Sequence, residues 1–296
     1  MDNSVQAALH STFLHTWLKS YNMRTCIITI VKDEQPYLRQ WIKYHIKLGI
    51  DTLFIFEDID SSSHANICKE FPNVKLDSVL SVFYNDTDRE SARRWKSEGR
   101  GLQHMYQGLA YGRIRKTGNF DWIFIIDVDE YITIEGNRTL HEVLDLYKDY
   151  EAVVMQWRNY GADGHYRKPD GEYDLTKTYQ KETGYSALDI RKRIITKVIY
   201  GRNTGFRSHH WPVDSSRWCR TDFSQDMDSL IFTNIYIRHY ITKSLEEYID
   251  KLYIRKMCYR GHRDIEEFFV YNPEMRDTPE SLEIIGKYHD IIVKNP

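Results

Sequence analysis

Residues 121–130, with the sequence DWIFIIDVDE, decide the fold. Six mostly apolar residues run directly into Asp127, Asp129 and Glu130. An apolar run this continuous predicts a strand buried on both faces, as in sheets covered by helices on both sides. In open α/β sheets, ligands bind beyond the carboxyl ends of the strands. The acidic residues at the end of this strand are therefore the first indication of function.

Strand and helix patterns alternate around this stretch. Apolar, β-branched runs predict three further strands, at 25–31, 52–56 and 73–83. Helical spacing predicts helices at 37–49, 64–71, 90–116 and 243–270. The first of these helices has Pro36 near its start and Gly49 at its end, as helix termini favour. After about residue 150 the pattern becomes irregular and polar. The alternation predicts an α/β sheet flanked by helices.

Composition and charge narrow the function classes. The 296 residues carry 41 Lys and Arg against 43 Asp and Glu, a net charge of −2, which gives no electrostatic reason to expect nucleic-acid binding. The four cysteines show no metal-ligand spacing, so we expect reduced thiols and a cytoplasmic protein. No apolar run reaches the ~18 residues of a membrane-spanning helix. Residues 4–20 predict an amphipathic helix that packs on the body or makes a peripheral contact with the inner face of the membrane.

The paired carboxylates of Asp127 and Asp129 favour a metal site. Carboxylates at the end of a buried strand are unfavourable unless they are hydrogen-bonded, ion-paired or bound to a cation. If the strand continued, the two side chains would point to the same side because strand side chains alternate. A divalent cation would relieve their repulsion, and oxygen ligands suit Mg²⁺ or Mn²⁺. The alternative is that both acids cap the following turn.

Several segments between residues 24 and 260 resemble a known group of enzymes. They are IVKDE at 30–34 with YLRQWI at 37–42, FED at 56–58, WIFIIDVDEY at 122–131, YGADGH at 160–165, KVI at 197–199 with His209-His210, and HYITKS at 239–244. In this order they resemble nucleotide-sugar transferases of the GT-A fold, and more narrowly glycosyltransferase families 2 and 92. Those families commonly have Asn at the position of Asp33.

The resemblance implies a GT-A-type, Rossmann-like mixed sheet flanked by helices, with an irregular acceptor-side region and C-terminal helices. It implies three parts: an N-terminal helical extension at 1–23, a transferase domain at 24–242, and a C-terminal helical segment at 243–296 packed on it. Within the domain, 24–135 would be the nucleotide-sugar-binding half and 136–242 the acceptor-side half.

The resemblance also implies roles for individual residues. Lys32, Glu34 and Asp58 would line the nucleoside pocket. Asp127 would contact the ribose or the hydrated metal, and Asp129 would bind the Mn²⁺ or Mg²⁺ ion directly. A histidine often completes such sites, and His209 and His239 are both candidates, each also open to a purely hydrogen-bonded role. Lys243, four residues after His239, is a candidate for neutralising the diphosphate.

The predicted reaction transfers a sugar with inversion from a nucleotide-diphosphate sugar, a UDP-sugar foremost, to a saccharide or a lipid-linked saccharide. Such a reaction serves polysaccharide or glycoconjugate synthesis. The sequence does not identify the general base of this reaction. Asp163, between Gly161 and Gly164, is one candidate for it, and the alternative is that Asp163 only forms a turn. The basic residues of 191–207 are either solvated or phosphate-binding.

Two other hypotheses remain, a nucleotidyltransferase or pyrophosphorylase, and a non-catalytic nucleotide-sugar-binding module. Against the nucleotidyltransferase or pyrophosphorylase hypothesis, this sequence lacks the glycine-rich phosphate loop that such enzymes usually have after the first strand.

Overall fold

The computed structural model describes residues 23–98, 102–183, 196–201, 217–225, 232–255 and 264–294. Three predicted features lie outside this part of the chain: the helix at 4–20, the side chain of His209, and the basic side chains of 191–207.

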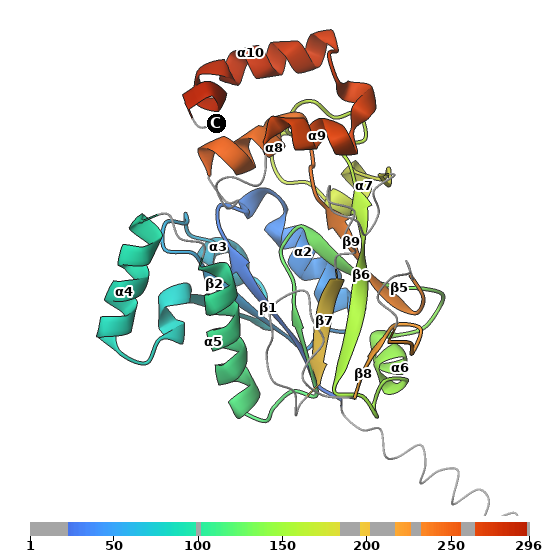
Figure 1. Ribbon diagram of the computed structural model, residues 1–296. Helices are drawn as coiled ribbons and strands as arrows, with labels where there is room; N and C mark the ends of the chain where they lie inside the picture. Colours follow the sequence, from blue (N-terminus) through green and yellow to red (C-terminus); the bar gives the residue numbers. More distant parts are fainter. Residues whose placement is uncertain are drawn as a thin grey trace, which may run out of the picture.

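The centre of the molecule is a mixed sheet (Figure 1). Its strands are β1 (Thr25–Val31), β2 (Thr52–Glu57), β3 (Val74–Ser78), β4 (Trp122–Ile125), β5 (Glu130–Ile134), β6 (Ala152–Tyr160), β7 (Thr196–Gly201), β8 (Trp218–Arg220) and β9 (Ile235–Tyr240). They lie in the order β3-β2-β1-β4-β7-β6-β9-β5, and β8 pairs with β6. Neighbours from β3 to β4 are parallel, whereas β7 is antiparallel to both β4 and β6. β9 is parallel to β6, so β1, β2, β4, β6 and β9 all run in one direction.

Helices cover both faces of this sheet. They are α2 (Gln35–Leu48), α3 (Ala65–Cys68), α4 (Asp86–Ser97), α5 (Gln103–Lys116), α6 (Leu140–Asp145), α7 (Leu175–Thr178), α8 (Leu245–Ile249), α9 (Ile265–Tyr271) and α10 (Pro279–Lys294), with short 3₁₀ turns η1 (Val79–Val82) and η3 (Pro273–Met275) and a π-helical turn η2 (Asp250–Ile254). In β1, Ile27 packs into the core under α2, and its neighbour Ile28 packs into the core under α5. This alternation is what a strand buried on both faces requires. The predicted α/β class, a mixed sheet flanked by helices, is confirmed.

Helix α2 shows how local sequence sets the start of the site. Pro36 occupies the first turn, where its missing N–H is not needed. Gly49 ends the helix with φ of +111°, and its N–H bonds to the carbonyls of His45 and Ile46. The indole of Trp41 donates to the carbonyl of Glu130 at 2.8 Å. That bond ties the helix after β1 to the residues after β4.

The structure differs from the predicted elements in several places. The predicted strand at 73–83 ends at Ser78 and continues as η1, and the predicted helix at 90–116 is two helices, α4 and α5. The largest error is β6, which lies in the region predicted to be irregular. Buried Gln156 and Asn159 make this strand look polar in sequence, although all but one of its residues are buried. Sequence spacing gives no indication of such burial because it comes from the sheet neighbours.

The C-terminal helices α8, α9 and α10 pack together at one end of the sheet (Figure 1). Their shared core includes Ala162, which follows β6. The predicted boundaries at 1–23, 24–242 and 243–296 stay a prediction. None of the helices in the described ranges is long and apolar enough to cross a membrane.

Candidate active site

The carboxyl ends of the parallel strands meet at one edge of the sheet. Glu34 follows β1, Asp58 follows β2, Asp129 follows β4 and Lys243 follows β9. Because these strands run in the same direction, their following residues lie at the same edge, where α/β folds place their ligands. This is the edge that the sequence predicts.

Asp129 is a buried anion held between two lysines. Its Oδ2 lies 2.7 Å from Nζ of Lys251 and 3.7 Å from Nζ of Lys243. Its carbonyl accepts a bond from the N–H of Tyr240 at 2.9 Å, which fixes the turn against β9. Burial alone would raise the pKa of this carboxyl, but the charges of Lys251, Lys243 and His239 outweigh it and hold the pKa well below its usual range. Asp129 is therefore an anion at neutral pH.

Lys243 is fixed in place. Its side chain is 2% exposed, its Nζ donates to the hydroxyl of Tyr37 at 3.1 Å, and it lies 4.6 Å from the centre of that ring. Its backbone has φ of +55°, which is uncommon for a side chain other than glycine and is held here by the surrounding packing. Lys243 therefore lies next to Asp129, and its role toward a diphosphate stays a prediction.

Two further cations reach the same place from η2, and sequence reasoning missed both. Lys251 binds Asp129, and Arg255, the residue after η2, lies 3.2 Å from Oε1 of Glu34. Arg255 also binds Asp250 at 2.6 Å. The sequence shows only a helical pattern here, and the partners Asp129 and Glu34 lie more than a hundred residues away along the chain. Single-turn π-helices are frequent at functional sites.

Glu34 is buried beside Arg255. Burial raises the pKa of this carboxyl, and the charges of Arg255 and Lys243 offset only part of that effect. Its backbone N–H donates to Nε2 of His64 at 3.0 Å, and His64 in turn contacts Glu57 at the end of β2. Within the described part of the chain, the second carboxylate oxygen of Glu34, Oε2, has no hydrogen-bond partner. A buried acceptor without a protein partner leaves a hydrogen bond for a water molecule, an ion or a ligand to complete.

The contacts described for Asp127 involve other residues than the two lysines that hold Asp129. β4 ends at Ile125, so both acids lie in a turn and the alternation of a strand does not apply to them. Oδ1 of Asp127 accepts from Gln103 at 2.8 Å, and its N–H donates to Glu130 at 2.8 Å. The expectation that the strand would point both carboxylates to one side is therefore wrong. Both nevertheless lie in one three-residue turn at the predicted edge.

His239 lies next to this turn. It is paired with Glu130 across β5 and β9, its Nδ1 contacts Oδ1 of Asn159 at 3.1 Å, and its ring packs on Trp157 with centres 4.0 Å apart. In the ranges that the structure describes, no three His, Cys, Asp or Glu side chains are grouped so that they could hold a metal. The roles of His239 and of the two aspartates toward a metal stay predictions.

The remaining predicted residues are more dispersed. Asp58 forms an ion pair with Lys96 of α4 at 2.5 Å. Lys32 contributes its carbonyl, which accepts from Arg255 at 3.2 Å. Asp163 lies at a separate small cavity of about 200 Å³, has φ of +52°, and accepts from the N–H of Gln180 at 3.0 Å. This geometry is that of a turn residue, and its role as a base stays a prediction.

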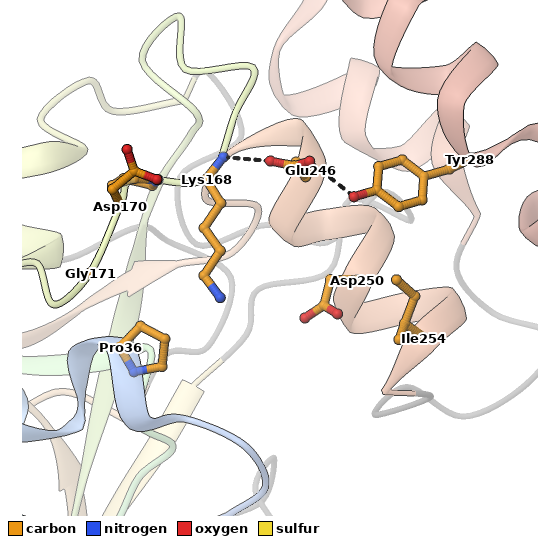
Figure 2. Close-up of a pocket in the computed structure, with 9 residues that line it drawn as sticks. Pro36, Lys168, Asp170, Gly171, Glu246, Asp250, Ile254 and Tyr288 are labelled. Atoms are coloured by element: carbon orange, nitrogen blue, oxygen red, sulfur yellow. Dashed lines mark hydrogen bonds between the residues drawn. The ribbon is translucent and has the colours of Figure 1, made fainter.

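A larger groove of about 440 Å³ opens beside Arg255. Figure 2 shows its walls, which combine carboxylates, one lysine and apolar surface. The lining residues are Pro36, Lys168, Pro169, Asp170, Gly171, Glu246, Asp250, Ile254 and Tyr288. Asp250 is the residue that binds Arg255, and Pro36 lies two residues after Glu34. Asp250 thus belongs both to the wall of the groove and to the ion pairs of Arg255.

The fold and this edge define an α/β protein with a GT-A-like sheet and a charged site at the carboxyl ends of its strands. The sequence profile of glycosyltransferase family 92 matches residues 21–291. The chain therefore belongs to glycosyltransferase family 92, which confirms the predicted glycosyltransferase class.

Plant proteins of this family are among its relatives. The chain is 29% identical over 133 residues to a family 92 glycosyltransferase of Oryza sativa subsp. japonica, covering 45% of this chain and 20% of that protein. It is 24% identical over 119 residues to one of Ricinus communis, covering 40% and 19%, and 27% identical over 114 residues to one of Arabidopsis thaliana, covering 38% and 17%. The matched segments thus span about a fifth of these relatives.

Among solved structures, a putative glucose-1-phosphate thymidylyltransferase from Bacillus anthracis in complex with a sucrose is similar at 10% identity. The match covers 61% of this chain and 72% of that one, with a TM-score of 0.30. A TM-score this low supports no argument about function, and so it does not favour the nucleotidyltransferase hypothesis.

Proposed function

We propose that this chain transfers a sugar from a nucleotide-diphosphate sugar to an acceptor hydroxyl, with inversion at the sugar carbon. One observation carries the proposal: a buried carboxylate, Asp129, and the cations Lys243, Lys251 and Arg255 converge at the carboxyl edge of the sheet. Breaking the bond from sugar to diphosphate leaves negative charge on the phosphates. Preorganised cations in a buried site stabilise such charge far better than they would in water.

The predicted divalent cation fits this edge by its ligand chemistry. Asp127 and Asp129 supply the oxygen atoms that Mn²⁺ and Mg²⁺ prefer, and they would hold the ion. When bound, such an ion polarises the diphosphate as a Lewis acid. Lys251 already lies at hydrogen-bonding distance from Asp129. For the metal ion to bind, Asp129 would therefore have to give up its contact with at least one lysine.

We further propose that the acceptor saccharide binds in the groove of Figure 2. Asp170 and Asp250 accept hydrogen bonds from sugar hydroxyls, and Lys168 donates them. The faces of Pro36 and Ile254 offer the apolar surface against which the C–H groups of a sugar ring pack. An inverting reaction needs one carboxylate to accept the proton of the hydroxyl. Asp163 remains the candidate from the sequence, and the groove adds Asp170 and Asp250.

The test is a panel of UDP-, GDP- and CDP-sugars, each with and without Mn²⁺. We expect one nucleotide class to raise the melting temperature only with Mn²⁺, and the same sugar nucleotide to be cleaved at a measurable rate. Asp127→Asn, at a partly exposed position, is the variant of choice and should abolish the cleavage while the protein stays folded. The absence of both stabilisation and cleavage across the panel would leave the non-catalytic binding module or another activity.

The acceptor proposal has its own test. Lys168→Ala combined with Asp170→Asn changes two exposed groove residues. We expect this variant to cleave the sugar nucleotide in water at the wild-type rate, but to show at least a tenfold higher KM for the acceptor. An unchanged KM for every acceptor that the wild type uses would place acceptor binding elsewhere.

A further inference from the structure

We propose that Lys251 is an exchangeable cation: it neutralises Asp129 in the donor-free protein and passes to the donor's diphosphate when a divalent cation takes that carboxylate. The inference rests on the proposed function and names the residue that couples the two ligands.

The two lysines on Asp129 differ in how firmly they are held. Lys243 is anchored by the hydroxyl and the ring of Tyr37, and its side chain is 2% exposed. Lys251 makes the shorter contact with Asp129, at 2.7 Å, and its side chain is 14% exposed. Among the residues that the structure describes, Asp129 is the partner of its ammonium group. Release of Lys251 therefore breaks this contact alone, whereas release of Lys243 would also break its contacts with Tyr37.

The backbone around Lys251 supports the same assignment. Lys251 lies in η2, a single π-helical turn that directly continues α8. Single π turns are rare and occur often at functional sites. At its end Arg255 bridges Glu34 and Asp250, and Asp250 lines the acceptor groove. A shift of this turn would move Lys251 and Arg255 together toward a diphosphate bound at the same edge.

The exchange has a thermodynamic signature. In the donor-free protein the ammonium group of Lys251 competes with a metal ion for Asp129, so the protein binds the metal weakly on its own. With both ligands present, Lys251 moves to the phosphates, so each ligand strengthens the other. By linkage this factor is the same in both directions. A lysine that only stabilises the fold would produce no such coupling.

The experiment measures Mn²⁺ binding by electron paramagnetic resonance and nucleotide binding by calorimetry on the full chain at pH 7.5. The nucleotide is whichever of UDP, GDP and CDP the wild type binds best. Lys251→Met should bind Mn²⁺ alone at least tenfold more tightly than the wild type. It should bind the nucleotide in saturating Mn²⁺ at least tenfold more weakly. The two effects have opposite signs, which loss of folding cannot produce.

Control variants keep the result interpretable. Lys287→Met removes a lysine of α10 that is 54% exposed and paired with Glu246, and it should change neither affinity. Lys251→Gln, which can still donate to Asp129, serves if the Met variant does not fold, and should shift both affinities in the same directions. Unchanged Mn²⁺ affinity, or weaker binding of both ligands, in the folded variant overturns the exchange. If the wild type binds none of these ligands, the proposed function itself fails.

Discussion

Replacing Asp129 by Asn removes the anion that Lys243 and Lys251 share. At 3.7 and 2.7 Å, and at an effective dielectric constant of about 20, the two attractions amount to about 4.5 and about 6 kcal/mol. The carboxylate also loses its own desolvation penalty of several kcal/mol when it is replaced. Breaking buried ion pairs in this way typically destabilises a protein by about 3–5 kcal/mol. We expect Asp129→Asn to lower the free energy of unfolding by that amount.

The assay is urea unfolding followed by tryptophan fluorescence, in EDTA, so that no metal contributes. With an m-value of about 3 kcal/mol/M, the midpoint should fall by about 1–1.7 M. Asp127→Asn, which removes a partly exposed carboxylate bonded to Gln103, should cost less than about 1 kcal/mol. Asp129→Asn with Lys251→Met should recover at least 1 kcal/mol, because one stranded cation is gone. The reasoning is refuted if both Asn variants lose the same small amount.

Three further predictions concern stability. His45 is buried, donates to the carbonyl of Trp41 and accepts from a backbone N–H, and burial lowers its pKa to about 3. As the pH falls, this histidine gains a proton near pH 6.5 in the unfolded chain but not in the native chain, so the free energy of unfolding should fall by about 2 kcal/mol between pH 7 and pH 5. Urea titrations of His45→Gln should lack this part of the loss. An equal loss in the variant and the wild type would contradict the prediction. Gly161→Ala should cost about 1–3 kcal/mol, because a Cβ there would lie 2.5 Å from Oδ1 of Asn272; a variant as stable as the wild type in the same titration would show that the loop adapts. Gly112 lies inside α5, and a Cβ added there would have nothing within 4 Å. Gly112→Ala should therefore raise the free energy of unfolding by about 0.5–1 kcal/mol and raise the melting temperature with it. A lower melting temperature would contradict this.

Much of the parallel part of the sheet, from β1 to β4, is predictable from the sequence. β1, β2 and β4 are continuous apolar runs, and the residues at their carboxyl ends are polar. Parallel pairing then brings those ends to one edge. The strands β6 and β9 are harder to predict from the sequence, because buried polar residues interrupt their apolar pattern. These residues include Gln156, Asn159 and His239. Their burial depends on partners that the local sequence does not specify.

The site was predictable in position more than in its contacts. The acidic pair and Lys243 were found from the end of a strand and from family resemblance. Lys251 and Arg255 were missed because a helical pattern does not reveal that one turn is a π turn aimed at Asp129. The turn that contains Asp127 and Asp129 was not predicted, because the alternation of strand side chains was applied to both residues.

The central claim is that a sugar donor's diphosphate binds at Asp127 and Asp129 through a divalent cation. A crystal grown with Mn²⁺ and the nucleoside diphosphate of the preferred donor tests it most directly, since the anomalous signal of manganese locates the ion. The account predicts manganese at Asp129, phosphate oxygens beside it, and Lys251 turned from the carboxylate to those oxygens. Manganese and nucleotide absent from this edge, with Lys251 still on Asp129, would contradict it.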